Sequence, residues 1–175
     1  MKKLKFCSLC GKELVLQTLD GTNRKKCQSC EFINFNNPKP AVAAVIIKDR
    51  KILLVKRAIN PHQGKWQIPG GFVESGESLE GGLKREIKEE LGVDIEILDY
   101  LESFGDGYSY GVPEETTVNI YFMTKIKQGR LKNDHENQEI KFFDLNKLPS
   151  VCFKNNRMAI ESYIKWNNKK PLRRN

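Results

Sequence analysis

The chain has 175 residues, of which 39% are hydrophobic and 30% charged, enough for one domain of about 140 residues and a small second unit. No stretch approaches the roughly 20 apolar residues of a membrane span, and the first residues lack an apolar run of signal-peptide length, so a cytoplasmic protein is expected. The net charge of +8 favours an anionic partner such as a nucleotide or a nucleic acid. Because much of this charge lies at the two ends of the chain, it does not by itself select a function.

Four of the five cysteines lie in the first thirty residues, in two CxxC pairs with sixteen residues between them. Disulfides are rare in cytoplasmic proteins, whereas two CxxC turns can aim four thiolates at one Zn²⁺ in a closed tetrahedral site. The predicted zinc ligands are Cys7, Cys10, Cys27 and Cys30. The fifth, Cys152, is expected to be a core thiol.

The spacer between the two pairs reads as a hairpin. Leu14–Leu16 is strand-like, Asp20-Gly21 is a turn signal, and Arg24–Lys26 leads back to the second pair. A segment of about 35 residues buries too little core to fold without its metal. We expect a structural zinc ribbon over residues 1–36 that packs on its neighbour or helps a homodimer form, with nucleic-acid binding as a less favoured alternative. Asn34–Pro40 is the expected linker.

The second domain is expected over residues 37–175 and opens with a buried hairpin. Ala41–Ile47 and Lys51–Val55 are apolar runs separated by Asp49-Arg50. A helix is then predicted from the Ser78 cap to about Leu91, before Gly92. Its apolar stripe is expected to consist of Leu79, Leu83, Ile87 and Leu91.

Three glutamates lie beside this stripe, at positions i, i+3 and i+4 of the helix. Glu86, Glu89 and Glu90 therefore project from one patch, where they repel one another when unpaired. A bound Mg²⁺ would relieve this repulsion and favours oxygen ligands. The residues alone favour a metal site only slightly over a solvated face.

The segment GFVESGESLEGGLKREIKEELGV, which starts at Gly71, resembles the Nudix box at every defined position. Those positions are Gly71, Glu77, Arg85, Glu86, Ile87, Glu89, Glu90, Gly92 and Val93. The resemblance extends over roughly Pro40–Trp166. It implies an α/β fold, an α/β/α sandwich around a mixed sheet, and an enzyme that hydrolyses nucleoside diphosphates linked to another moiety.

The resemblance also implies roles for individual residues. Glu86, Glu89 and Glu90 would bind Mg²⁺ or Mn²⁺, and one of them, or a glutamate on a later loop, would activate the attacking water. Arg85 would orient Glu89, and the backbone of Gly71 could approach the metal.

Further strands are expected at Glu96–Phe104, Val118–Lys127 and Ile140–Phe143, and a last helix at Asn155–Trp166. In the loop after the first of these strands, Tyr108 and Tyr110 are candidates for stacking on a base or flavin ring, although packing is an equally good interpretation. The later-loop candidates for metal binding are Glu136 and Glu139.

A zinc ribbon before a Nudix domain resembles the group of FAD, ADP-ribose and NADH pyrophosphatases. The segment LESFGDGYSYGVPEE lacks the signature that the NADH enzymes carry after the box, so FAD, ADP-ribose or a similar small nucleotide is the favoured substrate. The alternatives are NADH, the 5′ end of RNA, and a module that senses a nucleotide or binds nucleic acid without catalysis.

Overall fold

The computed structural model describes residues 4–106 and 116–169. These residues form two compact units. The smaller contains residues 4–39 with 116–117, and the larger contains residues 40–106 and 118–169. Among the described residues, no helix is long and apolar enough to cross a membrane.

The smaller unit holds a three-stranded sheet of order β1-β2-β3, formed by β1 (Leu14–Leu19), β2 (Thr22–Cys27) and β3 (Ile33–Asn34). Asp20 and Gly21 both have positive φ, 49° and 74°, as a two-residue turn between strands requires. The expected hairpin is therefore present. The irregular connection to the next strand covers only residues 35–38 rather than Asn34–Pro40, because Asn34 belongs to β3 and Lys39 and Pro40 belong to the next strand.

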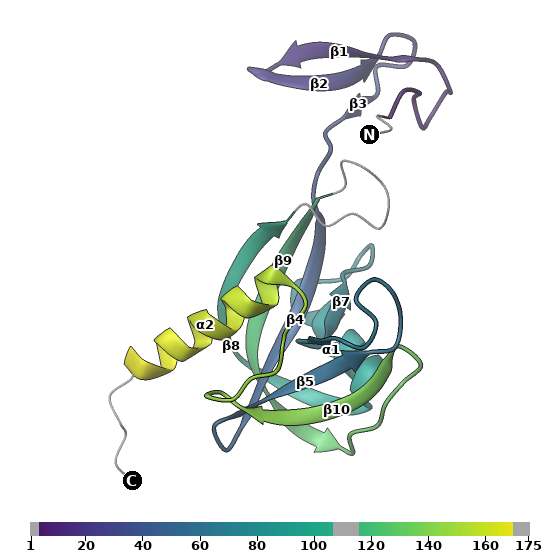
Figure 1. Cartoon of the computed structure of the whole chain (residues 1–175). Helices are drawn as coiled ribbons and strands as arrows, with labels where there is room; N and C mark the ends of the chain where they lie inside the picture. The colour runs from purple at the N-terminus through teal and green to yellow at the C-terminus, as the bar shows by residue number, and fades with distance from the viewer. Residues whose placement is uncertain (1–3, 107–115, 170–175) are drawn as a thin grey trace. The chain divides into compact units, whose positions relative to one another are not determined.

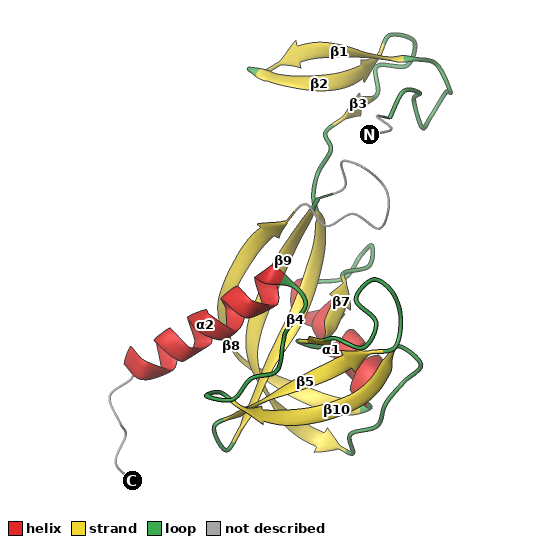
Figure 2. Ribbon diagram, viewed as in Figure 1, coloured by secondary structure: helices red, strands yellow, loops and turns green. Residues whose placement is uncertain are grey.

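The larger unit is built on a sheet of order β10-β5-β4-β9-β8, drawn in Figures 1 and 2. Two short strands join it, β6 on β5 and β7 on β4. The elements are β4 (Lys39–Lys48), β5 (Lys51–Arg57), β6 (Trp66–Gln67), β7 (Gly70–Phe72), α1 (Leu79–Leu91), β8 (Val93–Asp106), β9 (Thr117–Gly129), β10 (Asn137–Asp144) and α2 (Lys154–Lys169).

Both faces of this sheet are buried, which explains the near-continuous apolar runs of its central strands. Side chains alternate between the faces along a strand. In β4, Val42, Ala44 and Ile46 pack with α1, whereas Ala43 and Val45 pack with α2. One helix thus covers each face, and the expected α/β/α sandwich is confirmed.

The prediction of the apolar stripe is wrong for one of its four residues. Leu83, Ile87 and Leu91 are fully buried against the sheet, but Leu79 is 36% exposed and lies outside this cluster. The four-residue period identifies the inward face of a helix, but it does not say how far along the helix the sheet extends. Leu79 is the first residue of α1, one turn before the buried part.

Candidate active site and metal centre

Helix α1 carries the three box glutamates, and its two ends are fixed by their own caps. The Ser78 backbone is extended, and its Oγ accepts a hydrogen bond of 3.0 Å from Gly81 N–H. At the other end Gly92 has a φ of 72°, and its N–H donates to Lys88 O at 3.0 Å. Both predicted caps are therefore present, and they set the positions of the intervening carboxylates.

Strand β7 brings two glycines against the rest of the site. A Cβ on Gly70 would lie 2.1 Å from the carbonyl oxygen of Val42 in the neighbouring strand. A Cβ on Gly71 would lie 2.4 Å from the carboxyl carbon of Glu86. Glycine at position 71 therefore leaves the space that the Glu86 carboxylate occupies against the backbone.

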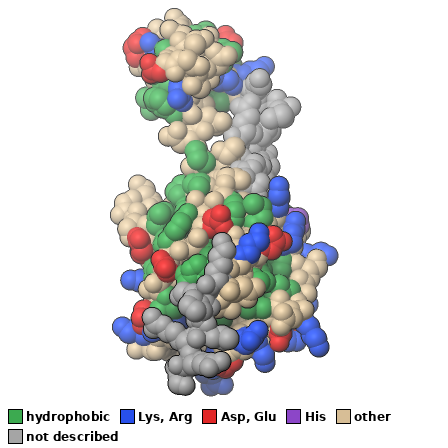
Figure 3. All heavy atoms as spheres, turned by 90° about the vertical axis from the view of Figure 1, so that its left-hand side faces the viewer, with side chains coloured by type: hydrophobic (Ala, Val, Ile, Leu, Met, Phe, Trp, Pro, Cys, Tyr) green, Lys and Arg blue, Asp and Glu red, His purple; other side chains and the backbone are tan. Residues whose placement is uncertain are grey.

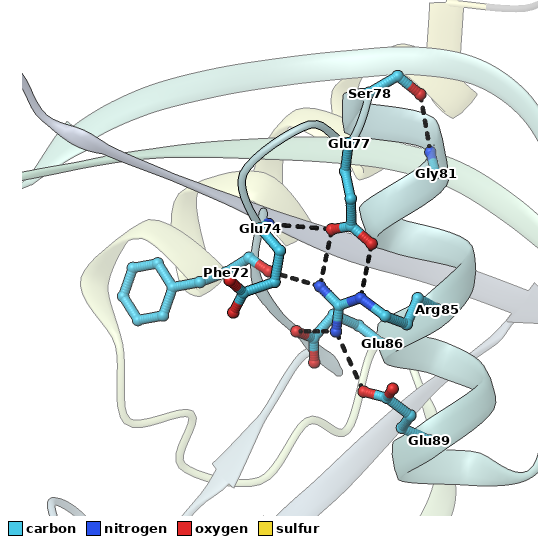
Figure 4. A network of polar contacts seen from close by, with 8 residues as sticks. All are labelled: Phe72, Glu74, Glu77, Ser78, Gly81, Arg85, Glu86 and Glu89. Atoms are coloured by element: carbon cyan, nitrogen blue, oxygen red, sulfur yellow. Dashed lines mark hydrogen bonds and ion pairs between the residues drawn. The ribbon is translucent and has the colours of Figure 1, made fainter.

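Arg85 lies at the centre of a network of charged groups (Figure 4). Its Nε and Nη2 donate to the two oxygens of Glu77, at 2.7 and 2.9 Å. Its Nη1 donates to Glu86 Oε1 at 2.8 Å and to Glu89 Oε2 at 3.1 Å, while Nη2 also donates to Phe72 O at 3.0 Å. One planar guanidinium thus connects the box loop to the helix, the type of contact for which arginine is suited.

This network corrects the expectation of unpaired carboxylates. Glu86 and Glu89 share one nitrogen of Arg85, and Glu90 Oε2 accepts a hydrogen bond of 2.9 Å from Gly70 N–H. Arg85 does contact Glu89, but its two-pronged partner is Glu77. The helical spacing did not show Glu77 as that partner, because Glu77 lies in the loop before α1; its place in the box was the only signal.

Burial sets the electrostatics of the site. Glu90 is only 6% exposed, and burial raises the pKa of its carboxyl to about 8, despite the Gly70 hydrogen bond and with a further contribution from the charge of Glu86. Burial also raises the pKa of Glu86, while Arg85 opposes this shift and the charges of Glu89 and Glu136 add to it. The buried carboxyl of Glu90 and the half-buried carboxyl of Glu86 therefore lie close together, where their negative charge is costly without a cation.

The structure separates the two later candidates, because Glu136 lies in the loop before β10 whereas Glu139 lies within that strand. The charge of Glu136 is near enough to raise the pKa of both Glu86 and Glu90. Its backbone is fixed by Asp134 Oδ1, which accepts from Glu136 N–H at 2.9 Å. Glu139 instead lies 4.0 Å from Lys56 Nζ on β5. Glu136 is therefore brought to the box glutamates, and Glu139 is directed to a lysine.

Other predicted residues contribute less. Tyr108 and Tyr110 lie outside the described residues. Cys152 is half-buried, and burial raises the pKa of its thiol, which is the opposite of what an activated nucleophile needs.

The donor set at the box fits a divalent cation. The groups near Glu90 and Glu86 are carboxylate oxygens and the backbone of Gly71, which are the oxygen ligands that Mg²⁺ prefers. Burial raises the pKa of the Glu86 and Glu90 carboxyls, and a nearby cation would lower it again, because the cation would stabilise their charged forms.

The four clustered cysteines form a second candidate metal centre, within the smaller unit. Their Sγ atoms all lie within 4.8 Å of one another. In each CxxC turn a backbone N–H donates to the first sulfur: Leu9 to Cys7 and Ser29 to Cys27, both at 3.4 Å. The Ser29 hydrogen bond is the largest cause that lowers the pKa of Cys27 to about 6, which favours the thiolate that a metal binds. This arrangement fits a structural Zn²⁺.

Comparison with known proteins agrees with this site. The NUDIX domain pattern matches residues 37–165, which include the whole box and most of the sandwich. The chain belongs to the Nudix family. The match begins after the four cysteines, so it does not bear on the ribbon.

Several Nudix relatives resemble this chain over most of its length. An ADP-ribose pyrophosphatase of Methanocaldococcus jannaschii is 39% identical over 132 residues, which are 75% of this chain and 76% of the relative. An NAD-capped RNA hydrolase NudC of Vibrio atlanticus is 28% identical over 86% of this chain, but over only 53% of its own length. The chain thus spans about half of that relative.

The structural comparison supports the same family. The crystal structure of a NUDIX hydrolase from Nitrosomonas europaea superposes with a TM-score of 0.78 and 31% identity, covering 96% of this chain and 95% of the other. The Nudix fold is therefore confirmed, and so is the expectation of an enzyme of the pyrophosphohydrolase type.

Proposed function

We propose that this Nudix enzyme uses Mg²⁺ or Mn²⁺ to cut the pyrophosphate bond of a nucleoside diphosphate linked to another moiety, such as ADP-ribose or FAD. The products are a nucleoside monophosphate and a phosphorylated remainder. The observation that carries this proposal is the pair of crowded carboxyls of Glu90, which is buried, and Glu86, which is half-buried and lies against the backbone of Gly71. The 39% identical relative named ADP-ribose pyrophosphatase supports the substrate class.

Each residue of the site then has a defined task. Glu86, Glu89 and Glu90 hold the cation on a rigid helix, with the backbone of Gly71 and the carboxylate of Glu136 beside them. When bound, the cation neutralises the pyrophosphate charge and lowers the pKa of a bound water. Arg85 keeps Glu86 and Glu89 oriented through Nη1. One of the box glutamates, or Glu136, accepts the proton of the attacking water.

The proposal is tested by Mg²⁺-dependent hydrolysis of a panel with FAD, ADP-ribose, NAD, NADH, nucleotide sugars and NAD-capped RNA. We expect wild type to cleave one of the small nucleotides and Glu89→Gln to lose at least about 10²-fold in kcat/KM, as for a lost transition-state donor. Glu80→Gln is the matched control, because Glu80 is an exposed acid in the first turn of the same helix. If wild type binds a panel member tightly but cleaves none, the proposed hydrolase activity is wrong and the protein is a nucleotide sensor.

A second candidate function is removal of the NAD cap from RNA. It is favoured by the relatives named NAD-capped RNA hydrolase NudC, although the chain spans only about half of their length. Among the described residues on the face in Figure 3, Lys and Arg are interspersed with Asp and Glu rather than gathered in one basic patch for an RNA backbone. Faster cleavage of NAD-capped RNA than of ADP-ribose in the panel would select this alternative.

We further propose that Cys7, Cys10, Cys27 and Cys30 hold a structural Zn²⁺ in a ribbon over residues 1–36, before a Nudix domain over residues 37–175. The support is the convergence of four sulfurs on one point and the backbone donors to Cys7 and Cys27. A site with four thiolates leaves no position for water or substrate, so its task is to stabilise the fold.

A further inference from the structure

The loop before β10 holds the backbone of Glu136 on both sides. Glu136 N–H donates to Asp134 Oδ1 at 2.9 Å, and Glu136 O accepts from Ala58 N–H, just past the end of β5, at 2.6 Å. Strand β10 pairs with β5 at the edge of the sheet, with Asn137 opposite Arg57 (Figure 1). The backbone that carries the Glu136 side chain is therefore tied both to the sheet and to one side chain of its own loop.

The same oxygen of Asp134 accepts a second hydrogen bond, which comes from a buried side chain. Asn137 Nδ2 donates to Asp134 Oδ1 at 3.0 Å, and Asn137 is only 4% exposed. Among the described residues, Asn137 Oδ1 is buried without a hydrogen-bond partner. Reversing the amide would turn this oxygen towards the Asp134 carboxylate, acceptor against acceptor, so the amide presents its nitrogen instead. A buried donor thus fixes the Asp134 carboxylate, through the stronger type of hydrogen bond that a charged acceptor makes.

The pairing of β10 with β5 is irregular at this point. Its register shifts between Asn137 and Glu139, so that Gln138 is an extra residue of β10. Such a bulge redirects the side chains of a strand and is common beside active sites. Here Asn137 contacts Asp134, whereas Glu139 is directed to Lys56.

The Glu136 carboxylate itself is not held by neighbouring side chains. Among the described residues, its one polar side-chain contact is with His135 Nε2, at 3.8 Å, on a ring that is 88% exposed. Yet the charge of Glu136 reaches Glu86 and Glu90, since it raises the pKa of both carboxyls. The position of the Glu136 carboxylate relative to the helix therefore depends on how its backbone is fixed.

We propose that Asp134 is a positioning residue of the reaction. Its carboxylate, anchored by the buried amide of Asn137, holds the backbone of Glu136 so that the Glu136 carboxylate reaches the glutamates of α1. Asp134 itself touches neither the substrate nor the cation. This inference rests on the proposed function, in which Glu136 lies beside the cation or accepts the proton of the attacking water. It gives a task to two residues that lie outside the Nudix box.

Steady-state kinetics of the full-length, zinc-loaded protein at saturating Mg²⁺ test the inference, with the panel member that wild type cleaves fastest. Asp134→Ala removes the acceptor, and kcat should fall about 10²-fold with little change in KM, as for a displacement of about 1 Å in an active site. Asp134→Asn keeps an oxygen acceptor for both donors and should recover most of this loss. Asn133→Ala is the matched control with wild-type kcat, because it removes a hydrogen bond to Gln138 O in the same loop without touching Glu136.

A double-mutant comparison separates positioning from a general weakening of the loop. Glu136→Gln should lower kcat at least about 10²-fold, and adding Asp134→Ala to it should cost little more, because both changes remove the same contribution. Thermal melts of all variants show that they are folded at the assay temperature. Additive losses in the double variant, full activity in Asp134→Ala, or an Asp134→Asn variant as slow as Asp134→Ala overturns the inference.

Failure of this inference can be told from failure of the proposed function. Glu136→Gln with full activity, beside an inactive Glu89→Gln, overturns the role of Asp134 alone. A wild type that cleaves no panel member, or Glu89→Gln with full activity, overturns both.

Discussion

At the scale of single residues, one guanidinium fixes much of the candidate site. Arg85 contacts three carboxylates and a carbonyl oxygen, and its two-pronged contact is with Glu77 in the loop rather than with a glutamate of the helix. The side of the helix on which Glu86, Glu89 and Glu90 lie could be predicted from spacing. Their partners could not, because these depend on where the loop before the helix and the loop of Glu136 approach it in space.

The Glu77–Arg85 ion pair leads to a prediction about how the stability of the fold changes as the pH falls. The Arg85 hydrogen bonds hold the pKa of Glu77 at about 2, below its ordinary 4.5. A carboxyl with a lowered folded-state pKa stabilises the fold above its ordinary pKa, and this contribution is lost as the pH falls towards the folded-state value. Glu77→Gln should therefore melt at a lower temperature near neutral pH and lose less stability than wild type between pH 4.5 and 2.

Thermal melts of wild type and Glu77→Gln across this pH range provide the measurement. Glu80→Gln, which replaces an exposed acid of the same helix, should follow the wild-type curve. Parallel curves for wild type and Glu77→Gln would contradict the assigned role of the ion pair.

At the scale of elements, sequence signals worked best where the chemistry is local. Helix α1 begins and ends where Ser78 and Gly92 predicted, and both hairpin turns have the positive φ values that Asp20-Gly21 and Asp49-Arg50 suggested. Element lengths were less predictable. Helix α2 runs from Lys154 to Lys169, beyond the expected range at both ends. Asn167 and Asn168 near its end are exposed, so no apolar period marked where the helix stops.

Because β7 lies close to α1, we predict the effect of replacing Gly71 by alanine. A methyl group there would meet the end of the flexible Glu86 side chain rather than backbone, so Gly71→Ala should displace the carboxylate at little cost in stability. Since a shift of about 1 Å in an active site can cost 10²-fold, we expect kcat/KM to fall by about that factor while the melting temperature changes little.

Steady-state kinetics at saturating Mg²⁺ and a thermal melt measure the two effects separately. Gly105→Ala is the control, because a Cβ at that position meets no atom within 4 Å. Full activity in Gly71→Ala would show that the position of Glu86 does not matter for the reaction.

At the scale of the whole molecule, the two units depend on different forces. The Nudix unit has an apolar cluster on each face of its sheet, whereas the buried cluster of the ribbon consists, among the described residues, of Cys7, Leu14 and Cys27, with Phe32 packed against it. So small a core cannot stabilise a unit of this size without a metal. The four-cysteine spacing already predicted this dependence.

Loss of the metal should therefore act on the ribbon and not on the Nudix fold. Cys27→Ser is expected to reduce the zinc content from one ion per chain towards none and to remove protection from hydrogen exchange in β1 and β2. Protection in α1 and β4 should persist. Cys152→Ser, which lies outside the cluster, is the control and should keep both the zinc and the exchange pattern. An unchanged zinc content in Cys27→Ser would contradict the four-cysteine site.

The central claim is that the carboxylates of α1 hold the divalent cation of the reaction, and a Mn²⁺ titration of zinc-loaded protein, followed by electron paramagnetic resonance, tests it most directly. Wild type should bind Mn²⁺, and Glu90→Gln should weaken binding by at least about tenfold, the loss seen even for residues that only support a ligand. Glu80→Gln should bind like wild type. Equal affinity in wild type and Glu90→Gln would contradict the claim.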